Sequence, residues 1–326
     1  MMYRDLGNTG LKVSEVGFGT WGLGGDSYGT TNDTESITAL NVAYEKGCNF
    51  FDTSDLYGEG HSETILQRAL GQHRKQIVIG TKFGMLPHIG FDMKQDFSNE
   101  HIEKALHASL ERLNTDYVDI YLFHSPSRNQ IEHSETSIKL LTDLKKQGKI
   151  KAIGVSARSP EDALWIVEHT GIQIVELNFN LIDQRAIELN IFNKAAKKGV
   201  GIIARTPLSF GYLSGKLSGN EVFPQNDHRS NWPLKQRELW AKAPKLFDIL
   251  NEGKQRTLTQ LALLFCIADP AVSTVIPGML SSKEVIENME ISILDKLNSA
   301  ELTKIRNIYK ENRFYDPTAK MVNNSN

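Results

Sequence analysis

The stretch SNEHIEKALHASLERLNTDYVDIYLFH, residues 98–124, combines a helical pattern with a β-rich run. Side chains suited to one buried face recur at the i, i+3, i+4, i+7 spacing of a helix: Ile102, Ala105, Leu106, Ser109, Leu110 and Leu113. Ser98 and Asn99 precede this pattern as N-cap candidates. The run YVDIYLFH, residues 117–124, is typical of a strand. The stretch therefore predicts an amphipathic helix followed by a strand.

The same alternation of short β-rich runs and amphipathic segments extends along the chain in both directions. The runs are VGFGT (16–20), NFFDT (49–53), IVIGT (77–81), YVDIYLFH (117–124), KAIGVS (151–156), IVELNF (174–179), GIIART (201–206) and STVIPG (273–278). Helical crossovers between strands predict a parallel sheet, and eight such units favour closure. A doubly wound sheet with a second domain would show a linker or a change of composition near the middle, and neither occurs. We therefore predict an α/β protein with one (β/α)8 TIM barrel over residues 1–326.

Three segments lie outside the eight repeats. Residues 3–14 contain two glycines and are predicted to form an N-terminal hairpin that closes the bottom of the barrel. Residues 211–253 form a long loop or insertion after the seventh strand. The chain from Asn298 is predicted to form one more helix, followed by a flexible tail over residues 317–326.

Composition excludes several classes of protein. Of the 326 residues, 37 are basic and 39 acidic, so no net positive charge favours nucleic acid or an anionic membrane. The two cysteines, Cys48 and Cys266, are too few for a disulfide framework or a zinc site. No apolar run approaches the roughly 18 residues of a membrane span. We expect a cytoplasmic protein without a membrane or nucleic-acid partner; the sequence does not predict its oligomeric state.

Gly17, Gly19 and Gly22 match the G-x-G-x-x-G pattern of dinucleotide-binding folds. The residues that follow, up to Tyr28, resemble a loop instead of a helix, and no acidic residue ends a second strand about 20 positions later. We therefore interpret these glycines as positions where the backbone approaches a ligand above the first barrel strand.

Four polar side chains fall at or just after the ends of consecutive predicted strands: Asp52, Tyr57, Lys82 and His124. Each alone has a structural explanation, as a cap, a packed ring, an exposed tip or a core histidine. In a barrel, however, the carboxyl ends of strands carry the chemistry, and neighbouring strands are about 4.8 Å apart. Their joint occurrence therefore favours an active site.

The four side chains suit proton donation to an oxygen. A tyrosine has an ordinary pKa near 10, and the positive charge of Lys82 would favour ionisation of Tyr57. Asp52 would keep Lys82 charged, and His124, as a neutral donor, would orient a carbonyl oxygen. The sequence contains neither a nucleophile beside a base nor a metal-ligand spacing, so no metal is expected. A reduction at this site would then need a hydride from elsewhere.

Several motifs together give the chain its resemblance to a known family: VGFGTWG (16–22), FFDTSDLYGEGHSETILQRAL (50–70), TKFG (81–84), YLFHSP (121–126), GVS (154–156), PLSFGYLSGK (207–216), VIPG (275–278), Glu287 and Asn288. On these residues the chain resembles the aldo-keto reductase superfamily over nearly its whole length. The resemblance implies a (β/α)8 barrel that reduces an aldehyde or ketone, including sugars and their derivatives, with a nicotinamide cofactor. It also implies that Asp52, Tyr57, Lys82 and His124 form the catalytic tetrad.

The resemblance further implies a site for NADP(H) or NAD(H). The residues assigned to it are Gly19, Thr20, Trp21, Ser156, Glu176, Arg205, Pro207, Leu208, Ser209, Gly211, Lys216, Arg229, Pro277, Gly278, Met279, Lys283, Glu284, Glu287 and Asn288. Three positions depart from the usual family pattern: Ala157 replaces Asn, Glu176 replaces Gln, and Arg205 replaces an aromatic that stacks on the nicotinamide. The alternatives for Lys216 and Arg229 are a solvated and a surface side chain.

The departure at Glu284 bears on the choice of cofactor. Family members that prefer NADPH usually have basic residues after the eighth strand, whereas this chain has only Lys283 there, followed by Glu284. A carboxylate repels a 2′-phosphate and accepts from a 2′-hydroxyl. We therefore expect a weak preference for NADPH, or comparable use of NADH.

Two other functions remain open from the sequence. Lys82 could form a Schiff base in an aldolase, although Asp52 beside it would keep the amine protonated. The chain could also bind the cofactor as a non-catalytic regulatory subunit. For the substrate, a small-molecule carbonyl compound, the candidate lining residues are Trp21, Phe83, Phe210, Trp232, Phe314 and Tyr315.

Overall fold

A computed structural model describes residues 1–87 and 93–318 of the chain. Its barrel strands are β3 (Phe18–Gly19), β4 (Phe50–Asp52), β5 (Val78–Phe83), β6 (Val118–His124), β7 (Ile150–Ser156), β8 (Ile174–Asn178), β9 (Gly201–Arg205) and β10 (Val272–Ile276). They form one parallel sheet in sequence order. Bridges from Val16 to Val275 and from Gly19 to Gly278 join its first and last strands. The predicted (β/α)8 barrel is therefore confirmed.

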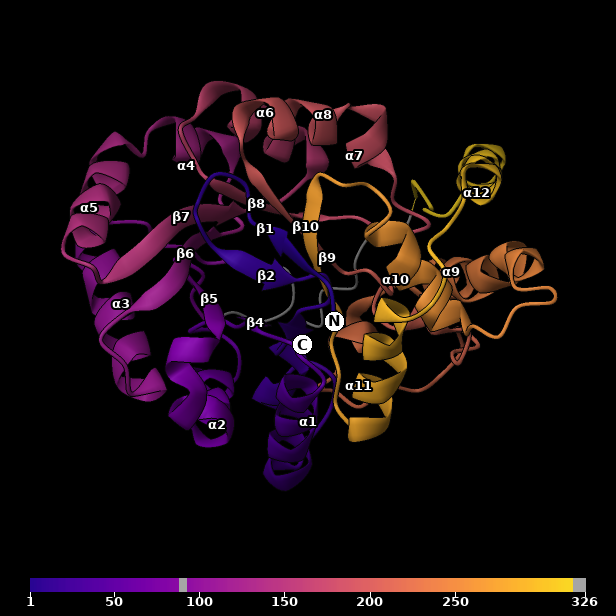
Figure 1. Ribbon diagram of the computed structural model, residues 1–326, viewed down its shortest axis with the longest axis horizontal. Helices are drawn as coiled ribbons and strands as arrows, with labels where there is room; N and C mark the ends of the chain where they lie inside the picture. Colours follow the sequence, from indigo (N-terminus) through magenta and orange to yellow (C-terminus); the bar gives the residue numbers. More distant parts are fainter. Residues whose placement is uncertain (88–92, 319–326) are drawn as a thin grey trace.

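A ring of helices surrounds the barrel in Figure 1. The α-helices of the described residues are α1 (Asp33–Glu45), α2 (His61–Leu70), α3 (Asn99–Leu113), α4 (Arg128–Glu132), α5 (Glu135–Lys146), α6 (Pro160–His169), α7 (Arg185–Glu188), α8 (Ile191–Lys198), α9 (Leu234–Phe247), α10 (Leu258–Cys266), α11 (Ser282–Met289) and α12 (Ser299–Glu311). The short 3-10 helices are η1 (Trp21–Gly24), η2 (Gly71–Gln76), η3 (Tyr212–Ser214), η4 (His228–Asn231), η5 (Asp248–Leu250) and η6 (Glu290–Ser292). Helix α3 is the helix that the sequence predicted after Ser98. Ser98 caps it, because its side chain accepts from the backbone N–H of His101.

Side chains alternate between the inside and the outside of the barrel. Along β5, Val78 packs in the inner apolar cluster, whereas Ile79 and Phe83 pack in the outer cluster beneath the helices. Lys82 has the same parity as Val78 and so lies inside, fully buried. This alternation places the Lys82 side chain at the centre of the barrel's upper end.

The N-terminal hairpin closes the barrel at the other end. Strands β1 (Tyr3–Asp5) and β2 (Lys12–Ser14) pair antiparallel, and they lie across the barrel end that faces the viewer in Figure 1. Leu6 and Val13 are fully buried and pack in the inner cluster. The hairpin is therefore the bottom plug that the sequence predicted.

The remaining predicted segments are also placed. The insertion after β9 holds η3, η4, α9 and η5. The predicted last helix is α12, and Asn298 caps it in a capping box with Glu301. Of the tail predicted to be flexible, residues 317 and 318 are described and residues 319–326 lie outside the described part.

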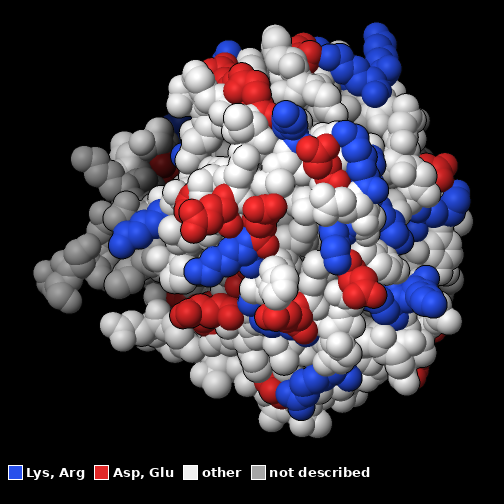
Figure 2. Space-filling model, turned by 90° about the vertical axis from the view of Figure 1, so that its left-hand side faces the viewer, with Lys and Arg blue, Asp and Glu red and all other residues white. Residues whose placement is uncertain are grey.

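Two surface properties bear on partners. Lys and Arg side chains alternate with Asp and Glu over the face shown in Figure 2, and neither sign forms an extended field there. Within the described ranges, every helix is too short or too polar to span a bilayer. The same residues hold no group of three or more side chains suited to a metal ion.

Candidate active site

Lys82 joins the predicted catalytic residues at the upper end of the barrel. Its Nζ donates to both carboxylate oxygens of Asp52 at 2.7 Å, to the Thr53 carbonyl at 2.9 Å and to the Tyr57 hydroxyl at 3.2 Å. Asp52 ends β4, and the turn that follows it brings Tyr57 back over Lys82. The loop after β4 and strand β5 therefore bring Asp52, Tyr57 and Lys82 into one hydrogen-bonded cluster.

His124 ends β6 beside this cluster. Its ring meets that of Tyr57 edge to face, with centroids 5.9 Å apart. Its Nδ1 lies 3.2 Å from the Ser54 hydroxyl, which also lies 3.1 Å from Asp55 Oδ1. The structure thus brings all four predicted side chains together and adds Ser54, which the sequence analysis did not single out although it lies inside the FDTSDLYG motif.

Burial and charge set the protonation of the cluster. Burial raises the pKa of Tyr57 above its ordinary value, and Asp52 and Glu176 raise it further, while Lys82 lowers it. Lys82 thus acts on Tyr57 in the direction that the sequence analysis expected, but Tyr57 keeps its proton, because desolvation and two carboxylates outweigh one ammonium. Burial lowers the pKa of Lys82, but Asp52 and Glu176 more than offset this, so the net pKa is raised and the amine stays charged.

Glu176, on β8, is a second buried carboxylate at this centre. Its Oε1 accepts from the Ser156 hydroxyl at 2.8 Å, and its Oε2 lies 3.8 Å from Lys82 Nζ. Burial raises the pKa of Asp52, and the negative charge of Glu176 raises it further, against the effect of Lys82. The sequence placed Glu176 only in the cofactor site, because its contact with Lys82 arises from closure of the barrel.

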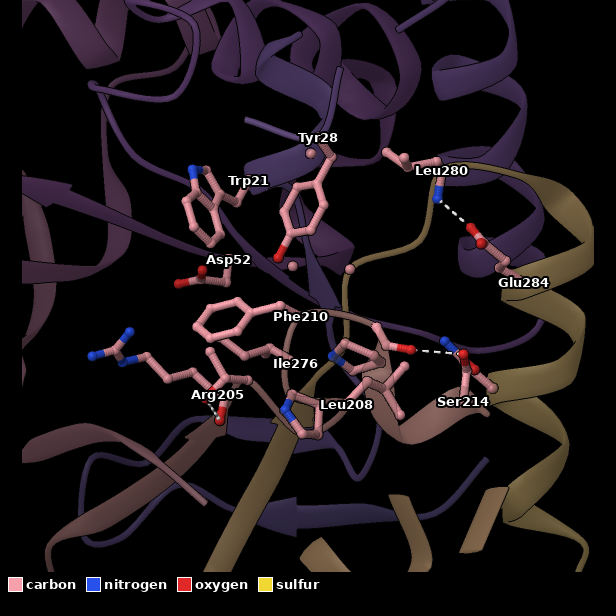
Figure 3. Close-up of a pocket in the computed structure, with 18 of the residues that line it drawn as sticks. Trp21, Tyr28, Asp52, Arg205, Leu208, Phe210, Ser214, Ile276, Leu280 and Glu284 are labelled. Atoms are coloured by element: carbon pink, nitrogen blue, oxygen red, sulfur yellow. Dashed lines mark hydrogen bonds between the residues drawn. The ribbon is translucent and has the colours of Figure 1, made fainter. Parts of the chain in front are cut away.

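A cavity of about 350 Å³ opens above the cluster. Most of the predicted residues line it: Gly19, Trp21, Asp52, Tyr57, His124, Ser156, Glu176, Arg205, Pro207, Leu208, Gly211, Lys216, Arg229, Pro277, Gly278, Glu284, Glu287 and Asn288. Figure 3 shows Arg205, Phe210 and Asp52 around one end of it and Glu284 at the other. The cavity is therefore elongated, with the tetrad at one end and the start of α11 at the other.

Some predicted site residues do not line the cavity. Lys82 is fully buried beneath it, and the Thr20 hydroxyl donates to the Asp52 carbonyl at 2.9 Å. Ser209 and Met279 are buried in the loops after β9 and β10, and Lys283 is exposed on the first turn of α11. Ser209 and Met279 could therefore contact a cofactor only through their backbone atoms, and Lys283 could act on it only through its surface charge.

Lys216 and Arg229, for which the sequence left a surface position open, both line the cavity. Lys216 lies 3.3 Å from Glu287 and remains largely exposed. Arg229 is held by Asp227, with Nε 2.9 Å from Oδ1, and its guanidinium lies 5.0 Å from the centre of the Tyr28 ring. Lys216 is thus an exposed charge at the rim, paired with Glu287, whereas Asp227 holds Arg229 in the wall.

Glu284 stands at the start of α11. Its Oε2 accepts from the backbone N–H of Leu280 at 2.7 Å, and its own N–H donates to the Ser281 cap. Figure 3 shows the Leu280 bond at the edge of the cavity. A carboxylate therefore occupies the helix N-terminus where an anionic phosphate would otherwise be favoured.

An aromatic wall was missed by the sequence analysis. His228 on η4 lies against Trp21, with ring centroids 4.6 Å apart, and Tyr28 meets Trp21 edge to face at 5.2 Å. Burial lowers the pKa of His228 to about 4, so the ring is neutral. The only sequence signal was position: Tyr28 follows the glycine-rich loop and His228 precedes Arg229.

The aromatic residues proposed to line the substrate site divide into two groups. Trp21 and Phe210 line the cavity. The interpretation of Phe83 and Phe314 is wrong, because both are buried in the outer core, Phe83 against Tyr121 and Phe314 against Phe247. Trp232 packs on Phe210 and Trp240, and Tyr315 packs on Trp240, behind the cavity wall.

Gly22, one of the glycines expected to approach a ligand, also lines the cavity. The remaining lining residues that were not predicted are Thr206, Ser214, Thr259, Ile276 and Leu280. Thr206 and Leu280 lie in the loops after β9 and β10, Ile276 ends β10, Ser214 ends η3 and Thr259 lies in the first turn of α10. Nothing in their types distinguishes them from ordinary turn or core residues, so only the folded arrangement identifies them.

Comparisons with known proteins agree with this geometry. The chain is 34% identical over 296 residues to L-galactose dehydrogenase of Arabidopsis thaliana, covering 88% of this chain and 86% of that protein. It is 31% identical to a probable aldo-keto reductase 1 of Glycine max, over 92% and 86% of the two chains.

Solved structures show the same similarity. Glycerol dehydrogenase of Gluconobacter oxydans superimposes with a TM-score of 0.80 at 28% identity, over 97% of this chain and 98% of its own. The holo form of an aldo-keto reductase from Bacillus halodurans gives 0.76 at 28% identity, over 94% and 96%. The model of the aldo/keto reductase family matches residues 15–310. The chain is therefore an oxidoreductase that belongs to the aldo/keto reductase family.

Proposed function

We propose that the protein interconverts an aldehyde or ketone and the corresponding alcohol with NAD(P)H, and that Tyr57 donates the proton in reduction. The observation that carries this proposal is the Tyr57 hydroxyl, 3.2 Å from the buried ammonium of Lys82 and at the floor of the cavity. Burial keeps Tyr57 protonated, so it has a proton to give. As the proton leaves, Lys82 stabilises the developing phenolate.

The other residues complete the machinery. Asp52 accepts from the ammonium of Lys82 at 2.7 Å through both carboxylate oxygens and so holds it beside the Tyr57 hydroxyl. The His124 ring packs edge to face against the Tyr57 ring, and in this proposal it orients the substrate oxygen. The bound cofactor would supply or accept the hydride.

The cavity fits a nicotinamide cofactor. Glu176 Oε2 and Arg205 Nε are both buried without a hydrogen-bond partner. A primary carboxamide, which carries both a donor and an acceptor, would satisfy these two atoms together with Ser156. The glycine and proline backbone of residues 277 and 278, Lys216 and Arg229 would hold the remainder of the dinucleotide along the cavity. NADP(H) and NAD(H) both remain candidates.

The substrate proposal is a small polyhydroxylated carbonyl compound such as a sugar or sugar derivative. Its support comes from the names of two similar proteins, an L-galactose and a glycerol dehydrogenase. Trp21 and Phe210 offer ring faces at the tetrad end of the cavity, which suits the C–H face of a sugar. Both cysteines are unbridged, consistent with the proposed cytoplasmic location.

Titration with NADPH and NADH by fluorescence, followed by turnover with a simple aldehyde, tests the proposal. We expect saturable binding and oxidation of the reduced cofactor. Binding without turnover over a range of aldehydes and ketones would instead indicate a regulatory subunit. A covalent adduct at Lys82, trapped by borohydride with a carbonyl substrate, would indicate an aldolase; the full burial and raised pKa of Lys82 argue against that outcome.

A further inference from the structure

Ser54 links His124 to a second carboxyl group outside the tetrad. Its Oγ lies 3.2 Å from His124 Nδ1 and 3.1 Å from Asp55 Oδ1, and it accepts from the Leu56 N–H at 3.2 Å. Ser54 is fully buried, and its hydroxyl carries a single proton. It therefore donates to His124 or to Asp55, and never to both at once.

The choice of acceptor determines where His124 carries its hydrogen. When Asp55 is ionised, Ser54 donates to it, and the neutral imidazole donates from Nδ1–H to Ser54, which leaves a lone pair on Nε2. When Asp55 is protonated, it donates to Ser54, Ser54 donates to Nδ1, and the imidazole hydrogen is on Nε2. The second arrangement carries one more proton than the first, which Asp55 takes up from the solvent.

We propose that Ser54 and Asp55 are positioning residues that set the tautomer of His124 and thereby the direction of reaction that the site favours. This inference rests on the proposed function. An Nε2–H group donates to a carbonyl oxygen and supports reduction, whereas an Nε2 lone pair accepts from an alcohol hydroxyl and supports oxidation. The two arrangements differ only in the positions of hydrogen atoms on Asp55, Ser54 and His124.

The surroundings of Asp55 bring this switch into the physiological range. Burial raises the pKa of Asp55 to about 7, the negative charge of Glu63 also raises it, and Arg112 lowers it. The titratable and charged groups that face Asp55 come from α2, α3 and β6: Glu63, Arg112 and Tyr121. Glu63 is itself held by the Arg112 Nε at 2.7 Å, and the Tyr121 pKa is raised by burial. Asp55 is thus the group of this cluster that titrates near neutral pH.

The test is the pH profile of kcat/KM in both directions, between about pH 5.5 and 9.5. For the wild type we expect kcat/KM for reduction to be level below an inflection near pH 7 and to fall about tenfold per pH unit above it, because one protonated group is required. We expect kcat/KM for oxidation to rise about tenfold per pH unit below the same inflection and to level off above it, since the overall reaction exchanges one proton. Tyr57 does not titrate there, because its pKa is raised.

Variants separate the switch from a structural role. Ser54→Ala keeps Asp55 but breaks the link, so the inflection near 7 should disappear in both directions. Ser54→Thr keeps the hydroxyl and should retain it. Asp55→Asn donates as a protonated carboxyl does, so reduction at pH 9 should stay within about threefold of its value at pH 6. Asp143→Asn, an exposed carboxylate on α5, is the matched control and should follow the wild type.

Two sets of results would overturn different parts of the account. An inflection near 7 that persists in Ser54→Ala, or a flat wild-type profile with normal turnover, would contradict the switch alone. Absence of cofactor binding and of turnover in either direction would contradict the proposed function, and the switch with it. Cofactor titration of each variant verifies that it is folded.

Discussion

Lys82 is the residue on which the protonation of the whole site depends. It is fully buried between Asp52 at 2.7 Å and Glu176 at 3.8 Å. The sequence predicted the first contact, because both residues end neighbouring strands. It could not predict the second, because Glu176 lies on β8 and reaches Lys82 only across the interior of the closed barrel.

Lys82→Met should abolish carbonyl reduction and also destabilise the fold. It leaves two buried carboxylates without their cation, at a cost of about 3–5 kcal/mol. Burial already raises the pKa of Asp52, and a carboxyl with a raised folded-state pKa loses stability as pH rises. The deficit relative to wild type should therefore be larger at pH 8 than at pH 5 in urea unfolding. Equal deficits at the two pH values would show that the carboxylates are not coupled to Lys82.

Arg205 carries the second residue-scale prediction. Its guanidinium donates to the Ala157 carbonyl at 3.1 Å and leaves Nε buried without a partner beside the cavity. Arg205→Ala should weaken cofactor affinity by around 1 kcal/mol, the order of a cation or guanidinium stack on a π system. Arg158→Ala, which removes an exposed arginine outside the cavity lining, is the control. Unchanged dissociation constants for NADPH and NADH in Arg205→Ala would show that Arg205 does not contact the bound cofactor.

At the scale of elements, the regular segments were predictable and the short ones were not. Alternating β-rich runs and the 3.6-residue pattern identify β3 to β10 and helices such as α3, because periodic burial leaves a periodic sequence. The 3-10 turns η1 and η4 have no such pattern. Their side chains, including His228, take their places from tertiary packing against Tyr28 and Trp21.

The N-terminus of α11 carries the prediction on cofactor choice. Glu284 accepts from the Leu280 N–H and places a negative charge where a 2′-phosphate would lie by the family resemblance. We expect the native preference for NADPH over NADH to stay within about tenfold, and Glu284→Arg to shift the ratio toward NADPH. Glu284→Gln, which removes the charge at nearly the same size, should give an intermediate shift. A native NADPH preference of about a thousandfold, roughly 4 kcal/mol, would contradict this reading of Glu284.

At the scale of the whole molecule, the barrel separates stability from chemistry. The count of eight repeats predicted closure, and the bridges between residues 16 and 275 and between 19 and 278 provide it. The hairpin seals the lower end with Leu6 and Val13, while the tetrad and the cavity occupy the upper end. In such barrels the lower face serves stability and the upper face catalysis.

Leu6→Ala tests this separation. The side chain is fully buried in the inner cluster, so its truncation should cost about 2–5 kcal/mol of unfolding free energy. Cofactor affinity and kcat of the folded fraction should remain at wild-type values, because among the described residues of the inner cluster only Ile276 also lines the cavity. Loss of cofactor binding at full folding would show that the two ends are coupled.

The account as a whole rests on proton donation by Tyr57, and single-turnover reduction by Tyr57→Phe measures it directly. The variant keeps the ring and removes the hydroxyl that lies 3.2 Å from Lys82. We predict nearly unchanged NADPH affinity and a rate of carbonyl reduction about 10²–10⁴-fold lower, the usual contribution of a positioned acid. Reduction at the wild-type rate with NADPH bound would contradict the assignment of Tyr57 as the proton donor.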